Sequence, residues 1–283
     1  MPSSGIILLD KEEGVTSRYC DNAIQKKLKN RHVGHLGTLD PFATGLLIVC
    51  FNSATKFLPY LKDEEKTYVA SLILGQKTST GDKTGEIIET KPIPSLTKED
   101  IEEALNSFLG DSLQIPPMTS AIKRDGVPLY KLAHEGKEIK REPRPIKVYS
   151  VKLLSFEANR IDFVVKVSKG TYIRTLGEDI ALKLGTLGYL NELRRIAIGD
   201  ITVDKAVKLD EVDESKLLPA SSFLGHIPSI LVSEEEAKKV KNGMTLDLKS
   251  SQDRVLVKFK EEILAIYQKK GDGHFHCQRG LWE

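Results

Sequence analysis

The stretch GHLGTLDPFATGLLIVCF, residues 34–51, joins a glycine-rich loop to an apolar run. Leu46–Phe51 is continuously apolar, which is typical of a central strand with both faces buried. Asp40 stands in the loop before that strand, and Pro41 after it disfavours helical backbone at Asp40. Because the preceding segment is basic, we expect this carboxylate to stay ionised at neutral pH. From these residues alone, Asp40 is either catalytic or the start of an ordinary Asp-Pro turn.

Strands and helices alternate irregularly on both sides of this stretch. Apolar runs and period-two alternation predict strands at residues 5–9, 46–51, 67–74, 148–156 and 161–167. Apolar stripes at helical spacing predict helices at residues 17–29, 97–109, 129–134, 174–184 and 186–195. Residues 75–85 are polar and glycine-rich, which predicts a plain loop. Because no βαβ order repeats, the pattern predicts an α+β fold with a mixed, largely antiparallel central sheet flanked by helices.

We predict a domain boundary near Gly225–Pro228, with a larger domain at residues 1–225 and a smaller one at 226–283. In the smaller part, Ser233 and Glu236 have the spacing of a capping box at the start of a short helix. Residues 254–260 and 263–268 then predict short strands. We therefore expect the tail to form a small β-rich domain.

The formal net charge of the 283 residues is only +2, which by itself does not indicate a nucleic-acid partner. The distribution of charge is less even. Residues 22–39 contain no Asp or Glu but hold Lys26, Lys27, Lys29 and Arg31, with His32 and His35. Residues 123–147 carry eight Lys or Arg against four Asp or Glu. These segments either form a polyanion-binding face or are solvated surface.

Three widely spaced cysteines, Cys20, Cys50 and Cys277, predict neither a disulfide framework nor a zinc site. His274 and His276 beside Cys277 come with no fourth ligand and no CxxC pair, so we expect no metal there. The first apolar run lacks a basic leader, and no apolar stretch reaches the roughly 20 residues that span a bilayer. We expect a cytoplasmic protein without a membrane segment.

The segment GHLGTLDP at 34–41, with ATG at 43–45, resembles the signature of the TruB-type pseudouridine synthases. Further elements resemble later motifs of that family in the same order: KTY at 66–68, PPMTSAIK at 116–123 with Gly126 and LYKLA at 129–133, GTYIR at 170–174 and LRR at 193–195. The tail, with AKKVKNGM at 237–244 and ILAI at 263–266, is similar to the PUA domain, a small RNA-binding β-barrel that ends these enzymes. The resemblance implies the pseudouridine synthase fold followed by a PUA-like domain.

The resemblance also implies an activity, the cofactor-free isomerisation of uridine to pseudouridine. Asp40 is then the nucleophile or the electrostatic catalyst beside the sugar. Arg174 would pair with Asp40, Tyr68 would lie against the uracil, and Tyr172 and Leu193 would line the pocket. Without the resemblance, the two tyrosines and Leu193 would be core residues, and Arg174 would be a surface residue at the start of a helix.

The partner that the resemblance implies is tRNA, with the target uridine at position 55 of the T arm. A base in a structured loop must be flipped out before it reacts. His35, otherwise an ordinary surface or hydrogen-bonding histidine, is expected to fill the gap by stacking or hydrogen bonding. Lys123 and Arg141, within the basic segments, are expected to bind phosphates, and we expect a monomer. Two alternatives are a non-catalytic RNA-binding or tRNA-folding protein and a pseudouridine synthase that acts on another RNA.

Overall fold

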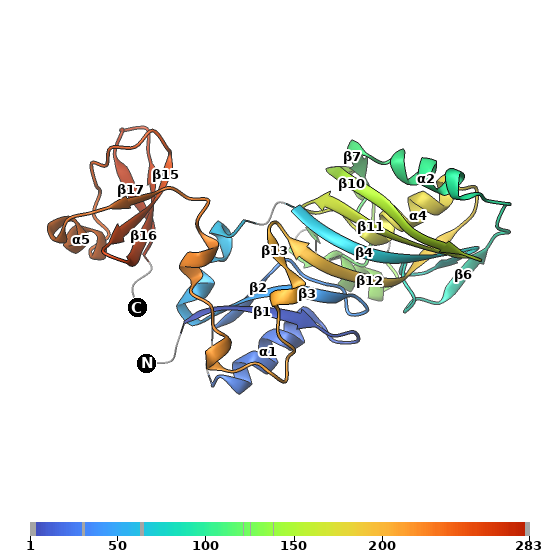
Figure 1. Ribbon diagram of the computed structural model, residues 1–283, viewed down its shortest axis with the longest axis horizontal. Helices are drawn as coiled ribbons and strands as arrows, with labels where there is room; N and C mark the ends of the chain where they lie inside the picture. Colours follow the sequence, from blue (N-terminus) through green and yellow to red (C-terminus); the bar gives the residue numbers. More distant parts are fainter. Residues whose placement is uncertain are drawn as a thin grey trace.

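The main feature of the fold is a nine-stranded sheet. The computed structural model describes residues 4–29, 32–62, 65–120, 122–124, 126–137 and 139–280. The strands follow the order β1-β3-β12-β4-β11-β10-β7, with β2 beside β3 and β13 beside β12 (Figure 1). They are β1 (Gly5–Lys11), β2 (Val33–Leu36), β3 (Thr44–Phe51), β4 (Glu65–Leu74), β7 (Gly110–Gln114), β10 (Arg144–Glu157), β11 (Arg160–Ser168), β12 (Gly188–Ile198) and β13 (Ile201–Thr202).

The sheet is mixed because β3 and β12 pair in parallel, whereas its other pairings among the described residues are antiparallel. Arg195 of β12 lies opposite Gly45 of β3 at this parallel contact. The backbone there is so close that a Cβ on Gly45 would lie 2.2 Å from the carbonyl oxygen of Arg195. Gly45 also has a φ of +103°, which other residues rarely adopt. Glycine at this position therefore permits the close approach that brings the loop before β3 against β12.

Helices cover the sheet in two places. The helices α2 (Lys98–Asn106) and α4 (Ile173–Lys183) contact β10, β12 and β4 and share a core of buried side chains with them (Figure 1). The helix α1 (Ser17–Lys27) packs against β1 and β3 through buried Cys20 and Ile24. Shorter elements complete this part: η1 (Asn52–Tyr60), β5 (Gln76–Thr78), β6 (Ile87–Thr90), β8 (Lys123–Arg124), β9 (Val127–Pro128), α3 (Leu129–His134), η2 (Val203–Lys205), η3 (Glu214–Lys216) and η4 (Ala220–Phe223).

The tail forms a separate four-stranded sheet, seen at the left of Figure 1. Its elements are β14 (Ser229–Leu231), α5 (Glu234–Lys241), β15 (Arg254–Phe259), β16 (Glu262–Lys269) and β17 (Phe275–Gly280). Val240, Tyr267 and Phe275 belong to its own core. Leu256 and Ile266 instead belong to a cluster that includes residues of β3 and of the linker before the tail, so the two parts are packed together.

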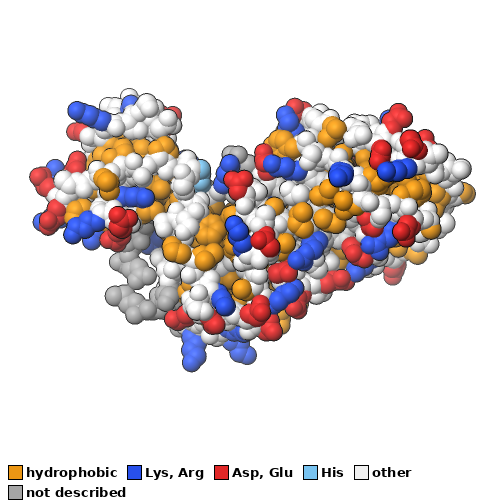
Figure 2. All heavy atoms as spheres, in the orientation of Figure 1, with side chains coloured by type: hydrophobic (Ala, Val, Ile, Leu, Met, Phe, Trp, Pro, Cys, Tyr) orange, Lys and Arg blue, Asp and Glu red, His pale blue; other side chains and the backbone are white. Residues whose placement is uncertain are grey.

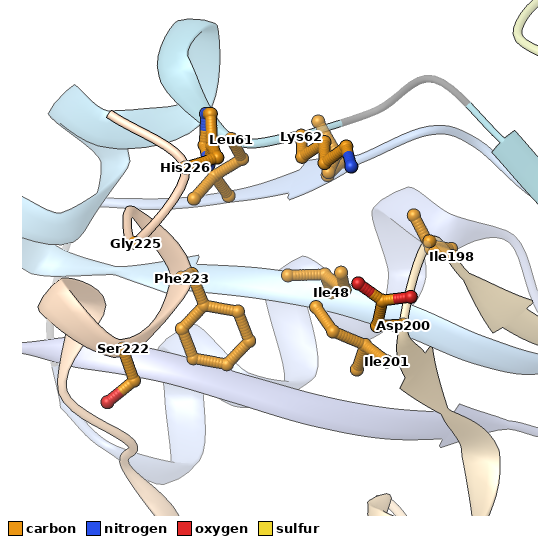
Figure 3. A pocket seen from close by; sticks show the side chains of 12 residues that line it. Ile48, Leu61, Lys62, Ile198, Asp200, Ile201, Ser222, Phe223, Gly225 and His226 are labelled. Carbon is orange, nitrogen blue, oxygen red and sulfur yellow. The ribbon is translucent and has the colours of Figure 1, made fainter. Parts of the chain in front are cut away.

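A cavity of about 280 Å³ lies where this linker meets the main sheet. Figure 3 shows Ile48, Ile201 and Phe223 at this cavity, with Asp200 and His226 also lining it. None of the candidate site residues whose side chains the structure describes lines it. On the face of the molecule shown in Figure 2, acidic and basic side chains are interspersed, without a single large basic patch.

The structure confirms most of the predicted elements, including α2 after Thr97, the antiparallel pair β10–β11 and the capping box of α5. The cap of α1 is Thr16 rather than Ser17, which is the first helical residue. The helix predicted at residues 186–195 is wrong, because this segment is the strand β12. A register shift in β12 between Leu190 and Glu192 breaks the alternation of its buried side chains. Its buried leucines at 190 and 193 are consequently three residues apart, a helix-like spacing.

Candidate active site

Asp40 lies in the loop between β2 and β3, and the backbone on each side of it is fixed by a buried side chain. The hydroxyl of Ser17 accepts a hydrogen bond from the N–H of Leu39 at 2.9 Å and donates to the carbonyl of the same residue at 3.2 Å. On the other side, the ammonium of Lys11 donates to the carbonyl of Pro41 at 3.2 Å. Because Ser17 and Lys11 are both about 1% exposed, they hold the loop from inside the protein.

Arg174, near the start of α4, forms an ion pair with Asp40. Its Nε lies 2.9 Å from Asp40 Oδ2, and its Nη2 donates to Asp40 Oδ1 at 3.3 Å. The guanidinium is itself held by the carbonyl of Thr80 and by the hydroxyl and carbonyl of Thr119, at 2.6–2.9 Å. The side chain of Arg174 is only 4% exposed, whereas that of Asp40 is 35% exposed. The pair is therefore anchored on its arginine side and open on its carboxylate side.

The charges around Asp40 act in opposite directions. Burial raises the pKa of Asp40 above that of an ordinary carboxyl, and the negative charge of Asp82 adds to this effect. The positive charges of Arg174 and Lys11 lower the same pKa. Burial also lowers the pKa of Lys11 itself to about 8. Neither of these two cations belongs to the basic segment before Asp40, from which the sequence analysis expected the stabilising charge to come.

A cavity of about 300 Å³ opens in front of this ion pair. Tyr68 of β4 and Leu193 of β12, which are 7% and 6% exposed, line it together with Tyr172, Asp40 and Arg174. Its volume is at the lower end of the range of about 300–1,000 Å³ that is usual for small-ligand sites. The structure thus brings five of the eight candidate residues together around one opening.

Of the remaining three candidates, His35 and Arg141 do not line this cavity. His35 contacts the side chain of Thr38, which does line it, at 3.2 Å from its Nε2. Arg141 donates to the carbonyl of Pro116 at 3.1 Å and lines a neighbouring cavity of about 540 Å³ together with Thr80 and Thr119. The side chain of Lys123 lies outside the part of the chain that the structure describes.

Two residues that the sequence analysis did not select also contribute to the site. Asp82, in the segment predicted to be a plain loop, is 4% exposed, and its Oδ2 lies 3.6 Å from Nη1 of Arg174. Gln114 uses both ends of its amide to hold the backbone of Tyr172, donating to its carbonyl at 3.0 Å and accepting from its N–H at 2.8 Å. These contacts join residues 58 to 92 positions apart, so no local pattern in the sequence indicates them.

The described residues contain no group of three or more His, Cys, Asp or Glu side chains placed to hold a metal ion. Within the same residues, no helix has the length and apolar character needed to cross a membrane.

Comparison with known proteins identifies the family. Residues 25–173 match the N-terminal domain of the TruB family pseudouridylate synthases, and residues 174–224 match the C-terminal domain of tRNA pseudouridylate synthase B. The tRNA pseudouridine synthase B of Chromohalobacter salexigens is 44% identical over 86% of this chain and 81% of its own length, and that of Hydrogenovibrio crunogenus is 42% identical over 90% and 85%.

Solved structures agree at the level of the fold. A chain of a Cbf5–Nop10–Gar1 complex aligns with a TM-score of 0.73 over 98% of this chain and 85% of that chain, at 24% identity. The alignment includes the β-rich tail, which fits a PUA-like domain. With two domain matches over residues 25–224 and relatives above 40% identity, the chain belongs to the TruB family of pseudouridylate synthases.

Proposed function

We propose that this protein isomerises uridine to pseudouridine in tRNA, and that its target is the uridine at position 55 of the T arm. The observation that carries the proposal is the Asp40–Arg174 ion pair, which faces a cavity walled by Tyr68, Tyr172 and Leu193. The names of the bacterial relatives support tRNA as the substrate.

In this reaction the C1′–N1 bond breaks, the base turns, and C1′ is joined to C5. The proton on C5 leaves and N1 gains one, so the reaction consumes no oxidant or reductant. Asp40 acts by bonding to the sugar carbon, by adding to the base, or by stabilising an elimination to a glycal. In each case the carboxylate must be ionised. Arg174 favours that state and fixes the orientation of Asp40 through two contacts, while the exposed side of the carboxylate faces the substrate.

The remaining side chains of the cavity suit a base that must rotate. A flat tyrosine ring holds a base by stacking or edge contact without fixing its rotation, and the hydroxyl of Tyr68 assists removal of the C5 proton in this proposal. Tyr172 and Leu193 complete the walls. Burial raises the pKa of Tyr172 above that of an ordinary phenol, which is already neutral at physiological pH.

The rest of the chain binds the RNA in this proposal. Residues 1–225 form the catalytic domain, and residues 226–283 form a PUA-like RNA-binding domain. His35 occupies the space left by the flipped uridine, and Lys123 and Arg141 contact phosphates, so affinity falls as salt rises. The protein acts as a monomer in the cytoplasm.

The test uses Asp40→Asn and a T-arm stem–loop labelled with tritium at C5 of its uridines. We expect release of tritium to fall by at least about 1,000-fold, because the group that acts directly on the substrate is lost. Binding of the RNA should change little. Asp111→Asn is the matched control, since the side chain of Asp111 is 79% exposed on β7.

Wild-type turnover in Asp40→Asn refutes the assignment of Asp40. A wild-type protein that binds the stem–loop but makes no pseudouridine would instead favour the non-catalytic RNA-binding function. Sequencing of the product shows which uridine reacts, and a product at any other position contradicts the T-arm proposal.

A further inference from the structure

A buried carboxylate lies behind His35. Asp21 of α1 has a side chain that is 2% exposed, and its Oδ2 lies 2.9 Å from Nδ1 of His35 on β2. The same oxygen lies 3.4 Å from Nη1 of Arg18, whose side chain is 72% exposed. Among the residues that the structure describes, the second oxygen of Asp21, Oδ1, is buried without a hydrogen-bond partner.

The contacts of Asp21 do little to stabilise the folded protein. A buried carboxylate costs free energy unless its oxygens are hydrogen-bonded, and Asp21 satisfies only one of them within the described residues. Its contact with Arg18 is long and exposed, so it contributes little. The short contact with His35 is therefore the feature of Asp21 that requires a functional explanation.

The contact with Asp21 determines the tautomer and the orientation of the His35 imidazole. Because an ionised carboxylate accepts hydrogen bonds and does not donate them, Nδ1 must carry a hydrogen to bond with Asp21. Nε2 then points to the opposite side of the ring, where it lies 3.2 Å from the hydroxyl of Thr38. Thr38 lines the cavity in front of Asp40. The imidazole is therefore held between the buried carboxylate of Asp21 and a residue of the cavity wall.

We propose that Asp21 is a positioning residue that fixes the tautomer and the orientation of His35 for contact with the RNA. The proposal rests on the proposed function, in which His35 fills the space of the flipped uridine. Because only 16% of the His35 side chain is exposed, a small part of the ring is open to the RNA. Asp21 fixes which part that is and removes the ring rotation that RNA binding would otherwise have to freeze.

The expected effect is on binding rather than on the chemical step, because neither residue touches the reacting atoms. Freezing one mobile side chain on association changes affinity by roughly 2- to 12-fold. We therefore expect Asp21→Ala to raise the Kd for a T-arm stem–loop by about 3- to 10-fold and to leave kcat at saturating RNA unchanged within about twofold. Asp21→Asn keeps an oxygen that accepts from Nδ1–H, so it should retain most of the affinity.

The decisive measurement is a double-mutant cycle with His35→Ala. If Asp21 acts through His35, Asp21→Ala has less than about a twofold effect on the Kd once the imidazole is absent. Arg18→Ala is the matched control, since it removes the other partner of the same oxygen and should leave the Kd unchanged. A loss of affinity that persists in the His35→Ala background, or an equal loss in Arg18→Ala, overturns the proposal.

A second measurement needs no variant and no RNA. Long-range ¹H–¹⁵N spectra of the full-length protein with ¹⁵N-labelled histidine report which ring nitrogens carry hydrogen. We expect Nδ1 of His35 to be protonated at neutral pH, and an unprotonated Nδ1 refutes the proposal. Because binding and ring protonation do not require turnover, an enzyme that makes no pseudouridine would refute the proposed function without deciding the role of Asp21.

Discussion

Substitution of Gly45 by alanine tests how the sheet positions the active site. The positive φ of Gly45 costs an alanine about 1–2 kcal/mol. The new Cβ would also lie 2.2, 2.9 and 3.0 Å from the O, N and C atoms of the Arg195 backbone, so β3 and β12 must move apart. Overpacking of this kind costs a further 1–3 kcal/mol or so. We expect Gly45→Ala to lower the free energy of unfolding by about 2–5 kcal/mol.

The control is Gly14→Ala. Gly14 has a φ of +84°, but a Cβ there would meet no atom within 4 Å, so only the backbone cost of about 1–2 kcal/mol applies. At about 2–4 °C for each kcal/mol, thermal melting should fall by about 4–20 °C for Gly45→Ala and by about 2–8 °C for Gly14→Ala.

Activity should separate the two variants more clearly. The loop that carries Asp40 leads directly into β3, and a displacement of about 1 Å in a reacting group can reduce the rate by about 100-fold. We expect that loss in kcat for Gly45→Ala, measured at a temperature where the protein is folded, and little loss for Gly14→Ala. If Gly45→Ala has the same melting temperature as Gly14→Ala and retains its kcat, the close approach of β3 and β12 does not position Asp40.

Two further substitutions test the surroundings of Asp40. Asp82→Asn removes a negative charge that raises the pKa of Asp40, so the ionised form persists to lower pH, and the acid limb of the kcat–pH profile should move downward. An upward movement of that limb contradicts the electrostatic account. Ser17→Ala leaves the N–H of Leu39 buried without its partner, which costs about 1–3 kcal/mol and releases the loop beside Asp40. Urea unfolding should show a lower free energy of unfolding, and the activity assay should show a lower kcat. An unchanged kcat would mean that Ser17 stabilises the fold but does not position Asp40.

Local patterns in the sequence were sufficient to predict most of the fold. The alternation in β4, the Thr97 cap of α2 and the capping box of α5 each lie within a few residues, and each element formed where it was predicted. β12 was mispredicted because the register shift between Leu190 and Glu192 gives its buried residues a helix-like spacing. Such shifts depend on the partner strand, so the segment alone does not reveal them.

The residues of the candidate site also fall into two groups, those that the sequence indicated and those that only the structure revealed. Asp40 stood out in its own loop, whereas Arg174, Tyr68 and Leu193 were selected through resemblance to a family. Asp82, Gln114 and Asp21 were not selected, because each is an ordinary polar residue in its own segment. Their importance arises from contacts with Arg174, Tyr172 and His35, which the fold makes across long stretches of chain.

The position of β12 explains how these distant segments meet. Arg195 lies opposite Gly45 on one side of β12 and opposite Tyr68 on the other. Its buried guanidinium donates to the carbonyls of Leu46 and Gly37, which lie on either side of Asp40 in the chain. A single strand therefore links the loop that carries the carboxylate to the strand that carries the aromatic wall. Any change that shifts β12 along β3 should misplace Asp40 relative to Tyr68, even when both side chains are intact.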